Sequence, residues 1–148
     1  MLWDIGSGSG SIAIEWLLCH PACNAFSIEQ NQTRSQCISS NAKDLGVDRL
    51  KVMTGVAPGC LEALPVPDAV FIGGGLSKEL LQALEVRLPK DTRLVANAVT
   101  LESEALLTSW HQRLGGELMR IDLSQAEPLG SKRGWKATYP IIQWRVIL

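Results

Sequence analysis

The sequence contains no long apolar run and no strong excess of either charge. It has no run of about eighteen apolar residues and no signal-peptide pattern at its start, so nothing predicts insertion into a membrane, and we expect a cytoplasmic protein. The formal net charge is −1 over 148 residues, which argues against a broad basic face and therefore against nucleic acid as a partner. Hydrophobic residues make up 46% of the chain, which is enough for one domain over residues 1–148 with a sizeable core.

The chain also lacks the residue patterns of disulfide, metal and nucleophile chemistry. Its cysteines show no C-x-x-C spacing, and we expect reduced thiols in the core at Cys19, Cys23, Cys37 and Cys60. The two histidines, His20 and His111, lie far apart with no ligand spacing around them, so no metal site is expected. No Ser/His/Asp, Cys/His or paired-carboxylate set is apparent. The search for function therefore turns to the glycine-rich segment near the start.

That segment follows the first predicted strand. An apolar strand over residues 2–5 runs into a D-x-G-x-G-x-G pattern, and a helix is predicted from about Ser11. A backbone that turns at once from strand to helix needs positive φ or close approach of a ligand, which glycine allows without a Cβ penalty. The start of the helix offers free N–H groups and a positive dipole end, which suit the carboxylate of a methionine moiety. The pattern therefore predicts a site for S-adenosylmethionine, with contacts from Asp4, Gly6, Ser7, Gly8, Ser9 and Gly10.

The spacing of the glycines argues against a nicotinamide dinucleotide. A G-x-G-x-x-G pattern would need glycine where the chain has Ser11 or Ala13. An acidic residue at the end of the second strand is also expected, and Glu29 stands about twenty residues beyond the loop. Its carboxylate can accept hydrogen bonds from both ribose hydroxyls, and a solvated glutamate at a strand end is the alternative. Gln30, the next residue, belongs to the same predicted cofactor site.

Short apolar runs alternate with amphipathic segments, which is typical of a parallel sheet covered on both faces. We expect strands at residues 2–5, 24–29, 50–54, 69–72 and 93–98, and helices at residues 11–19, 32–45, 77–88 and 100–114. The first helix carries Ile12, Trp16 and Cys19 at helical spacing. Gly46 is expected to end the second helix and Thr100 to cap the last one.

The hydrophobic period changes toward the C-terminus. Apolar and polar residues alternate over residues 119–123 and 142–146, which predicts two strands joined by a long loop. With no helix between them, these strands should pair antiparallel. Five βα units followed by such a hairpin predict the α/β fold of class I S-adenosylmethionine-dependent methyltransferases, a Rossmann-like fold with a mostly parallel seven-stranded sheet.

Several segments together resemble one family. They are the loop region 2–16, F-I-G-G-G at 71–75 and V-A-N-A-V-T-L-E-S at 95–103, with supporting matches at 125–130, 134–135 and 140–144. These segments are similar to the decarboxylating precorrin-6Y C5,15-methyltransferases of cobalamin biosynthesis, in their CbiT-type module. The resemblance covers nearly the whole chain, and the second and third segments are more specific than the first. In many bacteria such a module resembles the C-terminal half of a fused enzyme. We therefore expect this domain to lack an N-terminal segment or partner module, and to form a homo-oligomer.

The resemblance implies methylation of a meso carbon of a reduced tetrapyrrole, with loss of carbon dioxide from a ring acetate. Such a carbon is electron-rich, so in-line positioning of the methyl donor should supply most of the acceleration without a strong base. By the same analogy Gly55, Val56 and Ala57 should flank the adenine, and Ala57 has simple packing as its alternative. Gly73, at the end of the fourth strand, joins this cofactor site.

Substrate contacts are predicted at the same edge of the sheet. Gly74 and Gly75 would leave room for a large flat substrate, although a tight turn would also explain them. Asn97 is a polar residue in an apolar strand, and it is expected to be either a substrate contact, with a catalytic role, or a backbone clamp. The basic residues of the long loop are expected to pair with substrate carboxylates, or else to be solvated: Lys132, Arg133 and Lys136.

Three alternative functions stay open at this point. A methyltransferase with another small-molecule acceptor would keep the glycine loop and Glu29 but would not need the triple glycine or the basic loop. A nucleic-acid methyltransferase would be expected to show a basic face or an N-P-P-Y-like motif after the fourth strand. A non-catalytic cofactor-binding module would differ by showing no methyl transfer.

Overall fold

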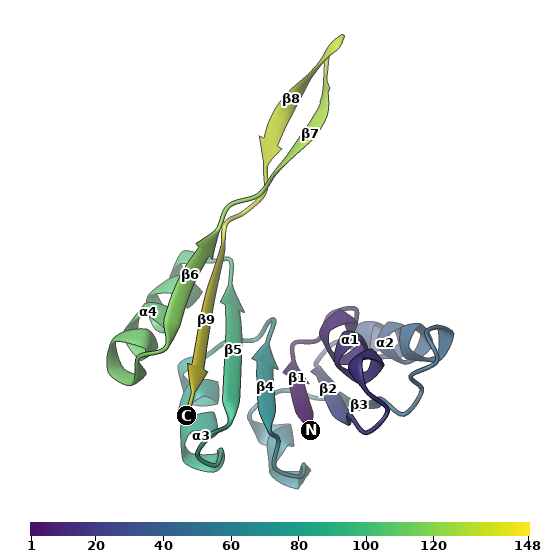
Figure 1. Ribbon diagram of the computed structural model, residues 1–148, viewed down its shortest axis with the longest axis vertical. Coiled ribbons are helices and arrows are strands. Elements are labelled where there is room, and N and C mark those ends of the chain that lie inside the picture. The colour runs from purple at the N-terminus through teal and green to yellow at the C-terminus, as the bar shows by residue number, and fades with distance from the viewer.

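The computed structural model describes residues 1–148 as a seven-stranded sheet with helices on both faces and a separate two-stranded ribbon (Figure 1). The sheet order is β3-β2-β1-β4-β5-β9-β6. Its strands are β1 (Leu2–Ile5), β2 (Ala25–Glu29), β3 (Lys51–Thr54), β4 (Ala69–Ile72), β5 (Arg93–Ala98), β6 (Glu117–Ile121) and β9 (Ile141–Ile147). The first five strands run parallel, and β9 pairs antiparallel with both β5 and β6. This arrangement confirms the predicted mostly parallel sheet with an antiparallel C-terminal pair.

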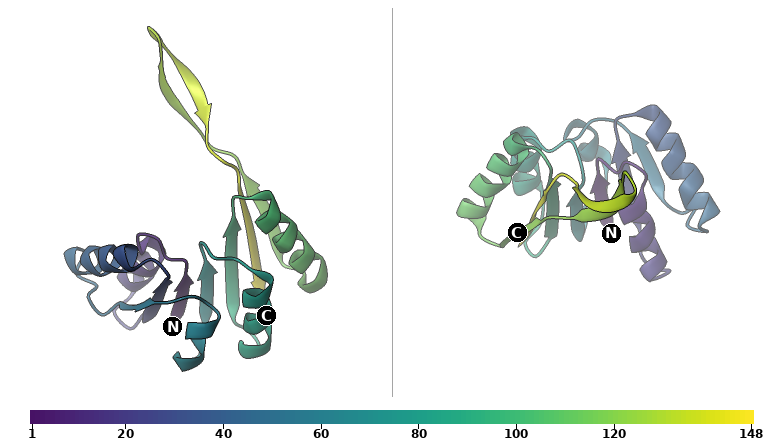
Figure 2. Two further views of the ribbon diagram at one scale, coloured as in Figure 1. Left: turned by 180° about the vertical axis from the view of Figure 1, so that it is seen from behind. Right: turned by 90° about the horizontal axis from the view of Figure 1, so that it is seen from above.

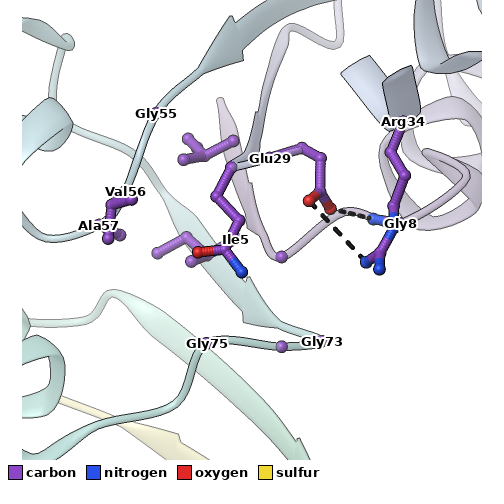
Figure 3. Close-up of a pocket in the computed structure, with 13 residues that line it drawn as sticks. Ile5, Gly8, Glu29, Arg34, Gly55, Val56, Ala57, Gly73 and Gly75 are labelled. Atoms are coloured by element: carbon purple, nitrogen blue, oxygen red, sulfur yellow. Dashed lines mark hydrogen bonds and ion pairs between the residues drawn. The ribbon is translucent and has the colours of Figure 1, made fainter. Parts of the chain in front are cut away.

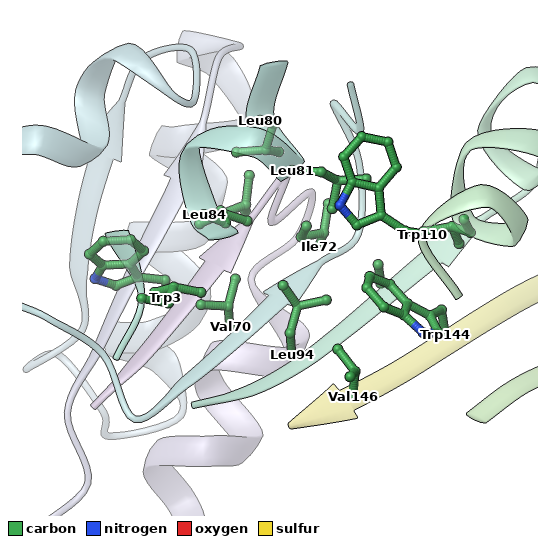
Figure 4. Packing of buried hydrophobic residues seen from close by; sticks show 14 of the residues in the cluster. Trp3, Val70, Ile72, Leu80, Leu81, Leu84, Leu94, Trp110, Trp144 and Val146 are labelled. Atoms are coloured by element: carbon green, nitrogen blue, oxygen red, sulfur yellow. The ribbon is translucent and has the colours of Figure 1, made fainter. Parts of the chain in front are cut away.

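Helices α1 (Ser11–Cys19) and α2 (Gln32–Asp44) lie on one face of the sheet, and α3 (Lys78–Arg87) and α4 (Leu101–Leu114) lie on the other (Figure 2). Their buried faces form two cores. The larger core joins α3 and α4 to the sheet, and the close-up shows Trp3, Trp110 and Trp144 packed among leucine and valine side chains (Figure 4). Trp3 and Trp144 are fully buried, and each indole N–H donates to a backbone carbonyl, so neither side chain leaves an unpaired donor in the core.

The helix ends follow the sequence signals. The Thr100 hydroxyl accepts a hydrogen bond from the Ser103 N–H at 3.2 Å and caps α4 as predicted. Gly46 follows α2 with a φ of +71°, the left-handed conformation expected just beyond a helix C-terminus.

The residues of α1 that stand at helical spacing in the sequence, Ile12, Trp16 and Cys19, do not form its buried face. Ala13, Ile14 and Leu17 are buried, whereas Ile12 is 41% exposed and Cys19 is exposed. Almost every residue of this helix is apolar, so its sequence does not mark one face, and contact with β1 and β2 selects the face that is buried.

The prediction of core thiols is wrong. All four cysteines are free, but none is buried: Cys19 and Cys37 are exposed, and Cys23 and Cys60 are half-buried. Small side chains such as Ala13 and Ala42 fill the closest helix-to-sheet contacts instead. None of the helices combines the length and the apolar character needed to cross a bilayer.

The third crossover differs from a full βα unit. Between β3 and β4 the chain forms only the short 3₁₀ helix η1 (Gly59–Ala63). The segment after β3 therefore runs as an open loop along the carboxyl edge of the sheet, where the pocket described below lies.

The predicted long loop between the last two sheet strands is a β-ribbon. Strands β7 (Ser124–Leu129) and β8 (Lys132–Ala137) pair antiparallel around a turn at Gly130, which has a φ of +62°. The ribbon projects away from the body of the molecule in Figure 1 and in the left view of Figure 2. Nearly all of its side chains are exposed, so its sequence carries no strict apolar alternation, and the pattern that reveals a half-buried strand is missing.

Candidate functional site

A pocket of about 270 Å³ opens at the carboxyl edge of β1, β2, β3 and β4 (Figure 3). This is the edge at which open α/β sheets bind ligands, and the volume lies close to the lower end of the range of roughly 300–1,000 Å³ for small-molecule sites. Four segments line it, one after each of these strands. The lining residues are Ile5, Gly6, Gly8, Ile28, Glu29, Gln30, Arg34, Gly55, Val56, Ala57, Gly73, Gly74 and Gly75.

The glycine-rich loop after β1 has the strained backbone that its sequence predicts. Gly6, Gly8 and Gly10 have φ values of +69°, +59° and +82°, which side chains with a Cβ rarely adopt. A Cβ at Gly10 would come within 2.7 Å of the Ile38 side chain, whereas a Cβ at Gly8 would meet nothing within 4 Å. Gly8 therefore borders open space, and that space is the pocket.

Glu29 lies at the end of β2 and is only 3% exposed, although it lines the pocket. Its two carboxylate oxygens accept hydrogen bonds from the backbone N–H groups of Gly8 and Asn31, both at 3.0 Å. The guanidinium of Arg34 lies 3.9 Å from the same carboxylate (Figure 3). Each carboxylate oxygen can accept more than one hydrogen bond, so Glu29 both fixes the glycine-rich loop and keeps acceptor capacity for a ligand.

Asp4 lies beneath the loop rather than in the pocket lining. It is 1% exposed, and one carboxylate oxygen accepts the Ala13 N–H in the first turn of α1 at 3.2 Å. The other oxygen is buried without a partner. Burial raises the pKa of this carboxyl from 3.8 to about 6, against the lowering effect of the Ala13 hydrogen bond and with a further rise from the charge of Glu29. Asp4 therefore anchors the helix that follows the loop, and the structure does not place it among residues that a ligand would touch.

Ser7 and Ser9 are likewise not among the residues that line the pocket. The Ser7 hydroxyl is buried and donates to the Asp4 carbonyl oxygen at 2.6 Å. Ser9 is exposed, and its carbonyl oxygen accepts from the Asn41 side chain at 3.0 Å. Together with buried Gly10, these residues shape the loop without lining the cavity.

The triple-glycine turn after β4 meets the first loop backbone to backbone. A Cβ on Gly6 would lie 2.5 Å from the nitrogen and oxygen of Gly74, and a Cβ on Gly73 would lie 3.2 Å from the Gly6 oxygen. Gly75 differs, because it has a φ of +70° and open space around it. Close contact between the two loops thus explains Gly6 and leaves little room for a side chain at Gly73, whereas a Cβ on Gly74 would make only ordinary contacts. Of the three glycines of this turn, only Gly75 combines a left-handed backbone with free room at the pocket.

The segment after β3 supplies the opposite wall. Figure 3 shows Val56 and Ala57 across the cavity from Gly8 and Arg34. The Gly55 N–H donates to the Glu29 carbonyl oxygen at 3.0 Å, which ties this wall to the end of β2. Val56 is 66% exposed and offers an apolar surface that nothing in the chain covers.

The predicted substrate residues outside the glycine turn do not reach this pocket. The Asn97 oxygen accepts a hydrogen bond from the Gln143 side chain, its register partner on β9, at 3.0 Å. The hydrogen bond to Gln143 is a side-chain contact rather than the backbone clamp, and the predicted substrate contact of Asn97 stays a prediction.

The three basic residues lie on β8 of the projecting ribbon, away from the pocket. Lys136 is 3.0 Å from Glu127 and Arg133 donates to the Ala126 carbonyl oxygen, while Lys132 has no partner within the chain.

Sequence analysis missed three lining residues. Ile5 and Ile28 are the last or next-to-last residues of their strands, and a rule that counts strand ends as pocket walls would have found them. Arg34 lies in the first turn of α2, and only the packing of α2 against the end of β2 brings it beside Glu29. Glu29 and Arg34 are the only charged residues of the lining.

Comparison with known proteins extends this picture. A family model described as a precorrin methyltransferase domain matches residues 1–148. A precorrin-6Y C(5,15)-methyltransferase [decarboxylating] from Sinorhizobium sp is 50% identical over 145 residues, which are 97% of this chain and 35% of that relative. A cobalt-precorrin-6B C(15)-methyltransferase (decarboxylating) from Salmonella typhimurium is 26% identical over 145 residues, 95% of this chain and 74% of that relative. This chain thus spans about a third of the length of the first relative and about three quarters of the second.

Solved structures agree in fold. The C-terminal domain of precorrin-6Y C5,15-methyltransferase from Rhodobacter capsulatus superposes with a TM-score of 0.95 at 50% identity, over 99% of this chain and 79% of that one. A S-adenosylmethionine-dependent O-methyltransferase from Thermotoga maritima has a TM-score of 0.71 at 16% identity, over 99% of this chain and 59% of that one, and shows the shared fold alone. The predicted methyltransferase fold class is therefore confirmed.

Proposed function

Because the chain belongs to the precorrin methyltransferase domain family, we propose that it is a S-adenosylmethionine-dependent C-methyltransferase of cobalamin biosynthesis. Its substrate would be a precorrin, and methylation would be accompanied by decarboxylation of a ring acetate. The observation that carries the proposal is the pocket itself, which brings the glycine-rich loop and the buried carboxylate of Glu29 to one edge of the sheet.

The residues present fit an adenosyl cofactor. The Glu29 carboxylate suits the ribose hydroxyls, Val56 and Ala57 offer an apolar wall for the adenine, and open space at Gly8 leaves room for the methionine part. The other lining residues predicted for the cofactor are Gly6, Gln30, Gly55 and Gly73. Bound S-adenosylmethionine would supply an electrophilic methyl group on sulfur. The chain's own part is to hold the donor and acceptor in line and to keep water from the reacting atoms.

The pocket's charges support a positioning mechanism rather than acid–base catalysis. Glu29 is already engaged by two backbone N–H groups, and Arg34 carries a permanent positive charge, so neither suits the role of a general base. A reduced tetrapyrrole carbon is electron-rich, and its attack on a methyl sulfonium needs alignment more than deprotonation. Gly74 and Gly75 leave the side of the pocket toward β5 free of side chains, where a large planar substrate could approach.

The lengths of the relatives favour one of the two methylations. The longer relative, from Sinorhizobium sp, is named for methylation at C5 and C15, and this chain spans 35% of it. The shorter relative, from Salmonella typhimurium, is named for C15 alone, and this chain spans 74% of it. Both names include decarboxylation. Because this chain aligns with the part that the two kinds of relative share, we assign to it the C15 methylation and the decarboxylation.

We also propose that the β7–β8 ribbon contacts another polypeptide chain or module. The ribbon carries Ala126, Pro128 and Trp135 on one face, and the Trp135 side chain is 80% exposed. An isolated two-stranded hairpin is marginally stable in water, so a homo-oligomer contact or a second precorrin methyltransferase module is the expected cover for this face. Light scattering on the parent and on Trp135→Ser should show an oligomer that the variant weakens. A monomeric parent would contradict the homo-oligomer.

A cytoplasmic location is also proposed. The four cysteines are free in the structure, which suits a compartment in which thiols stay reduced.

The test of the proposed function begins with binding. Calorimetry should show that the purified chain binds S-adenosylhomocysteine, and Gly8→Val should not bind it. Incubation of the chain with a precorrin-6 intermediate and labelled methyl donor should then give a product that has gained one methyl group and lost one carboxyl group, as read by mass spectrometry. Binding without turnover of any acceptor would indicate a non-catalytic module, and turnover of a different small molecule would contradict the tetrapyrrole assignment.

A further inference from the structure

Arg34 is the only cationic side chain that lines the pocket. It lies in the first turn of α2, whose N-cap is Asn31, and the Asn31 side chain accepts the Arg34 backbone N–H at 3.0 Å. Figure 3 shows its side chain beside Gly8 and the Glu29 carboxylate, across the cavity from Val56 and Ala57. The cap fixes the backbone at this position, so the guanidinium reaches the pocket from a rigid support.

The guanidinium of Arg34 makes no hydrogen bond within the chain. Its approach to Glu29, at 3.9 Å, is too long for one, and the side chain is 62% exposed. Other arginines behave differently, because Arg49 donates to the Leu17 carbonyl oxygen at 2.6 Å and Arg87 to the Leu64 carbonyl oxygen at 2.9 Å. Those two side chains hold loops together, whereas the donors of Arg34 are free to meet a ligand.

Local helix stability does not explain this residue. A positive charge in the first turn of a helix opposes the helix dipole, and α2 has no acidic residue in that turn to balance it. The only nearby anion is Glu29, and a pair this exposed on one side contributes little to stability. A role at the pocket is therefore the better account of its position.

The chemistry of the neighbouring carboxylate indicates what Arg34 would bind. A hydroxyl group is at once a donor and an acceptor, but an ionised carboxylate can only accept and a guanidinium can only donate. Side by side, Glu29 and Arg34 offer one group of each kind within 3.9 Å. This pair matches a hydroxyl, or two adjacent hydroxyls, better than it matches a phosphate, which the carboxylate would repel.

We propose that Arg34 is a specificity-determining residue that donates a hydrogen bond to a ribose hydroxyl oxygen of the adenosyl cofactor, while the Glu29 carboxylate accepts a hydrogen bond from a ribose hydroxyl. The inference rests on the proposed function, because it assumes an adenosyl ligand in this pocket. It adds that the ribose is recognised from both sides, so a deoxyribose ligand loses a contact to Arg34 as well as one to Glu29.

The experiment measures dissociation constants by calorimetry for the parent, Arg34→Met and Arg34→Lys. The ligands are S-adenosylhomocysteine, 5′-methylthioadenosine and the 2′-deoxy and 3′-deoxy forms of the latter. Lys43→Met is the matched control, since Lys43 is a cation in the last turn of the same helix and lies outside the pocket lining. Circular dichroism and melting temperature verify that each variant is folded.

We expect Arg34→Met to weaken binding of S-adenosylhomocysteine and methylthioadenosine by about three- to tenfold, the effect of one charge-assisted hydrogen bond at a partly exposed site. The same substitution should have no effect on the deoxy ligand that lacks the contacted hydroxyl. Arg34→Lys should recover part of the loss, and Lys43→Met should bind every ligand as the parent does.

Four results would overturn the inference. An equal loss for ribose and deoxyribose ligands would assign Arg34 a structural role. A loss for S-adenosylhomocysteine without one for methylthioadenosine would place Arg34 at the methionine carboxylate. Failure of the parent itself to bind S-adenosylhomocysteine would remove the proposed function and this inference together, whereas normal binding by Arg34→Met would remove the inference alone.

Discussion

The pocket end of the sheet buries polar side chains, whereas the β7–β8 ribbon exposes large apolar ones. Six polar or charged residues of the chain are buried, and five of them gather around the glycine-rich loop: Asp4, Ser7, Ser27, Glu29 and Ser35. The ribbon instead exposes Trp135 and Leu129, which are 80% and 71% accessible. Buried polar groups cost free energy unless they are bonded, and exposed large apolar groups are costly unless they are covered. This contrast supports the proposals that the first region binds a ligand and that the second contacts a partner.

The two regions also use glycine for different reasons. Gly8 and Gly130 have almost the same backbone, with φ values of +59° and +62°, and a Cβ at either would meet no atom within 4 Å. One borders the pocket and the other is the turn of the ribbon. A substitution at either glycine should change the free energy of unfolding through the left-handed backbone. Only a substitution at Gly8 should also change the affinity for a ligand.

The largest effect is expected for Gly8→Val. A β-branched residue at positive φ should cost about 1–3 kcal/mol in the free energy of unfolding at either position, so Gly8→Val and Gly130→Val should be destabilised alike. Only Gly8→Val should lose binding of S-adenosylhomocysteine, because its side chain would occupy the cavity. Calorimetry measures the binding of S-adenosylhomocysteine, and chemical denaturation measures the free energy of unfolding. Normal binding by Gly8→Val would contradict the proposal that Gly8 borders the cofactor site.

The next effect concerns Asp4 and depends on pH. Because the pKa of the folded state is raised from 3.8 to about 6, the protonated form is favoured in the fold, and this group opposes folding when ionised. Stability should therefore rise as the pH falls from above 6 toward 4. The penalty above pH 6 is roughly 3 kcal/mol, from about 1.4 kcal/mol for each pKa unit.

Asp4→Asn tests this account. The amide oxygen can still accept the Ala13 N–H, and the amide nitrogen would replace the carboxylate oxygen that is buried without a partner. We expect the variant to be more stable than the parent at pH 8, by up to roughly 3 kcal/mol, and equal to it near pH 4. Denaturation curves at both pH values check this. Loss of S-adenosylhomocysteine binding by a folded variant would show that Asp4 contacts the cofactor, as the loop sequence predicts.

Glu29→Ala should have the third largest effect, and on two quantities at once. Removal of the carboxylate leaves the Gly8 and Asn31 N–H groups without their partner, so unfolding free energy should fall by about 1–3 kcal/mol. Cofactor affinity should fall by roughly ten- to a hundredfold. The sequence alone predicts weaker binding without unfolding, and these two backbone contacts add the stability loss.

Glu127→Ala on the ribbon is the matched control for Glu29→Ala. Its carboxylate pairs with Lys136 at the surface, so the variant should lose no more than about 1 kcal/mol and should bind cofactor normally. Calorimetry and denaturation on both variants give the comparison. Equal losses of unfolding free energy in the two variants would show that the buried Glu29 carboxylate contributes no more to stability than the surface carboxylate of Glu127.

The smallest effect is expected when Lys132, Arg133 and Lys136 are replaced together by Gln. All three are exposed, so stability should change by no more than about 0.5 kcal/mol, and cofactor affinity should not change. If the ribbon of one copy meets a substrate with several carboxylates, the apparent KM for precorrin should rise and lose its dependence on ionic strength. Kinetics identical to the parent at all salt concentrations would show that the ribbon serves assembly only.

Much of the pocket could be predicted from local sequence. Gly6, Gly8 and Glu29 were found because a strand, a tight turn and a strand-end acid leave patterns within about twenty residues of one another. Arg34 could not be found this way, since an arginine in the first turn of a helix is an ordinary surface residue until α2 packs beside β2. The partner of Asn97 could not be predicted either. The polar side chain of Asn97 is explained by Gln143, which is 46 residues away in sequence and adjacent only in the sheet.

The sequence by itself determined the mostly parallel sheet, its antiparallel C-terminal strand pair and the glycine-rich loop, because hydrophobic period and glycine spacing are local properties. The tertiary structure alone decided which face of α1 is buried, that Asp4 supports the loop from below, and that Gly6 and Gly74 touch. It also decided that the segment between β6 and β9 extends as a ribbon. The physical reason is that these features depend on specific three-dimensional contacts, such as those of Gly6 with Gly74, and such contacts leave no periodic signal in the sequence.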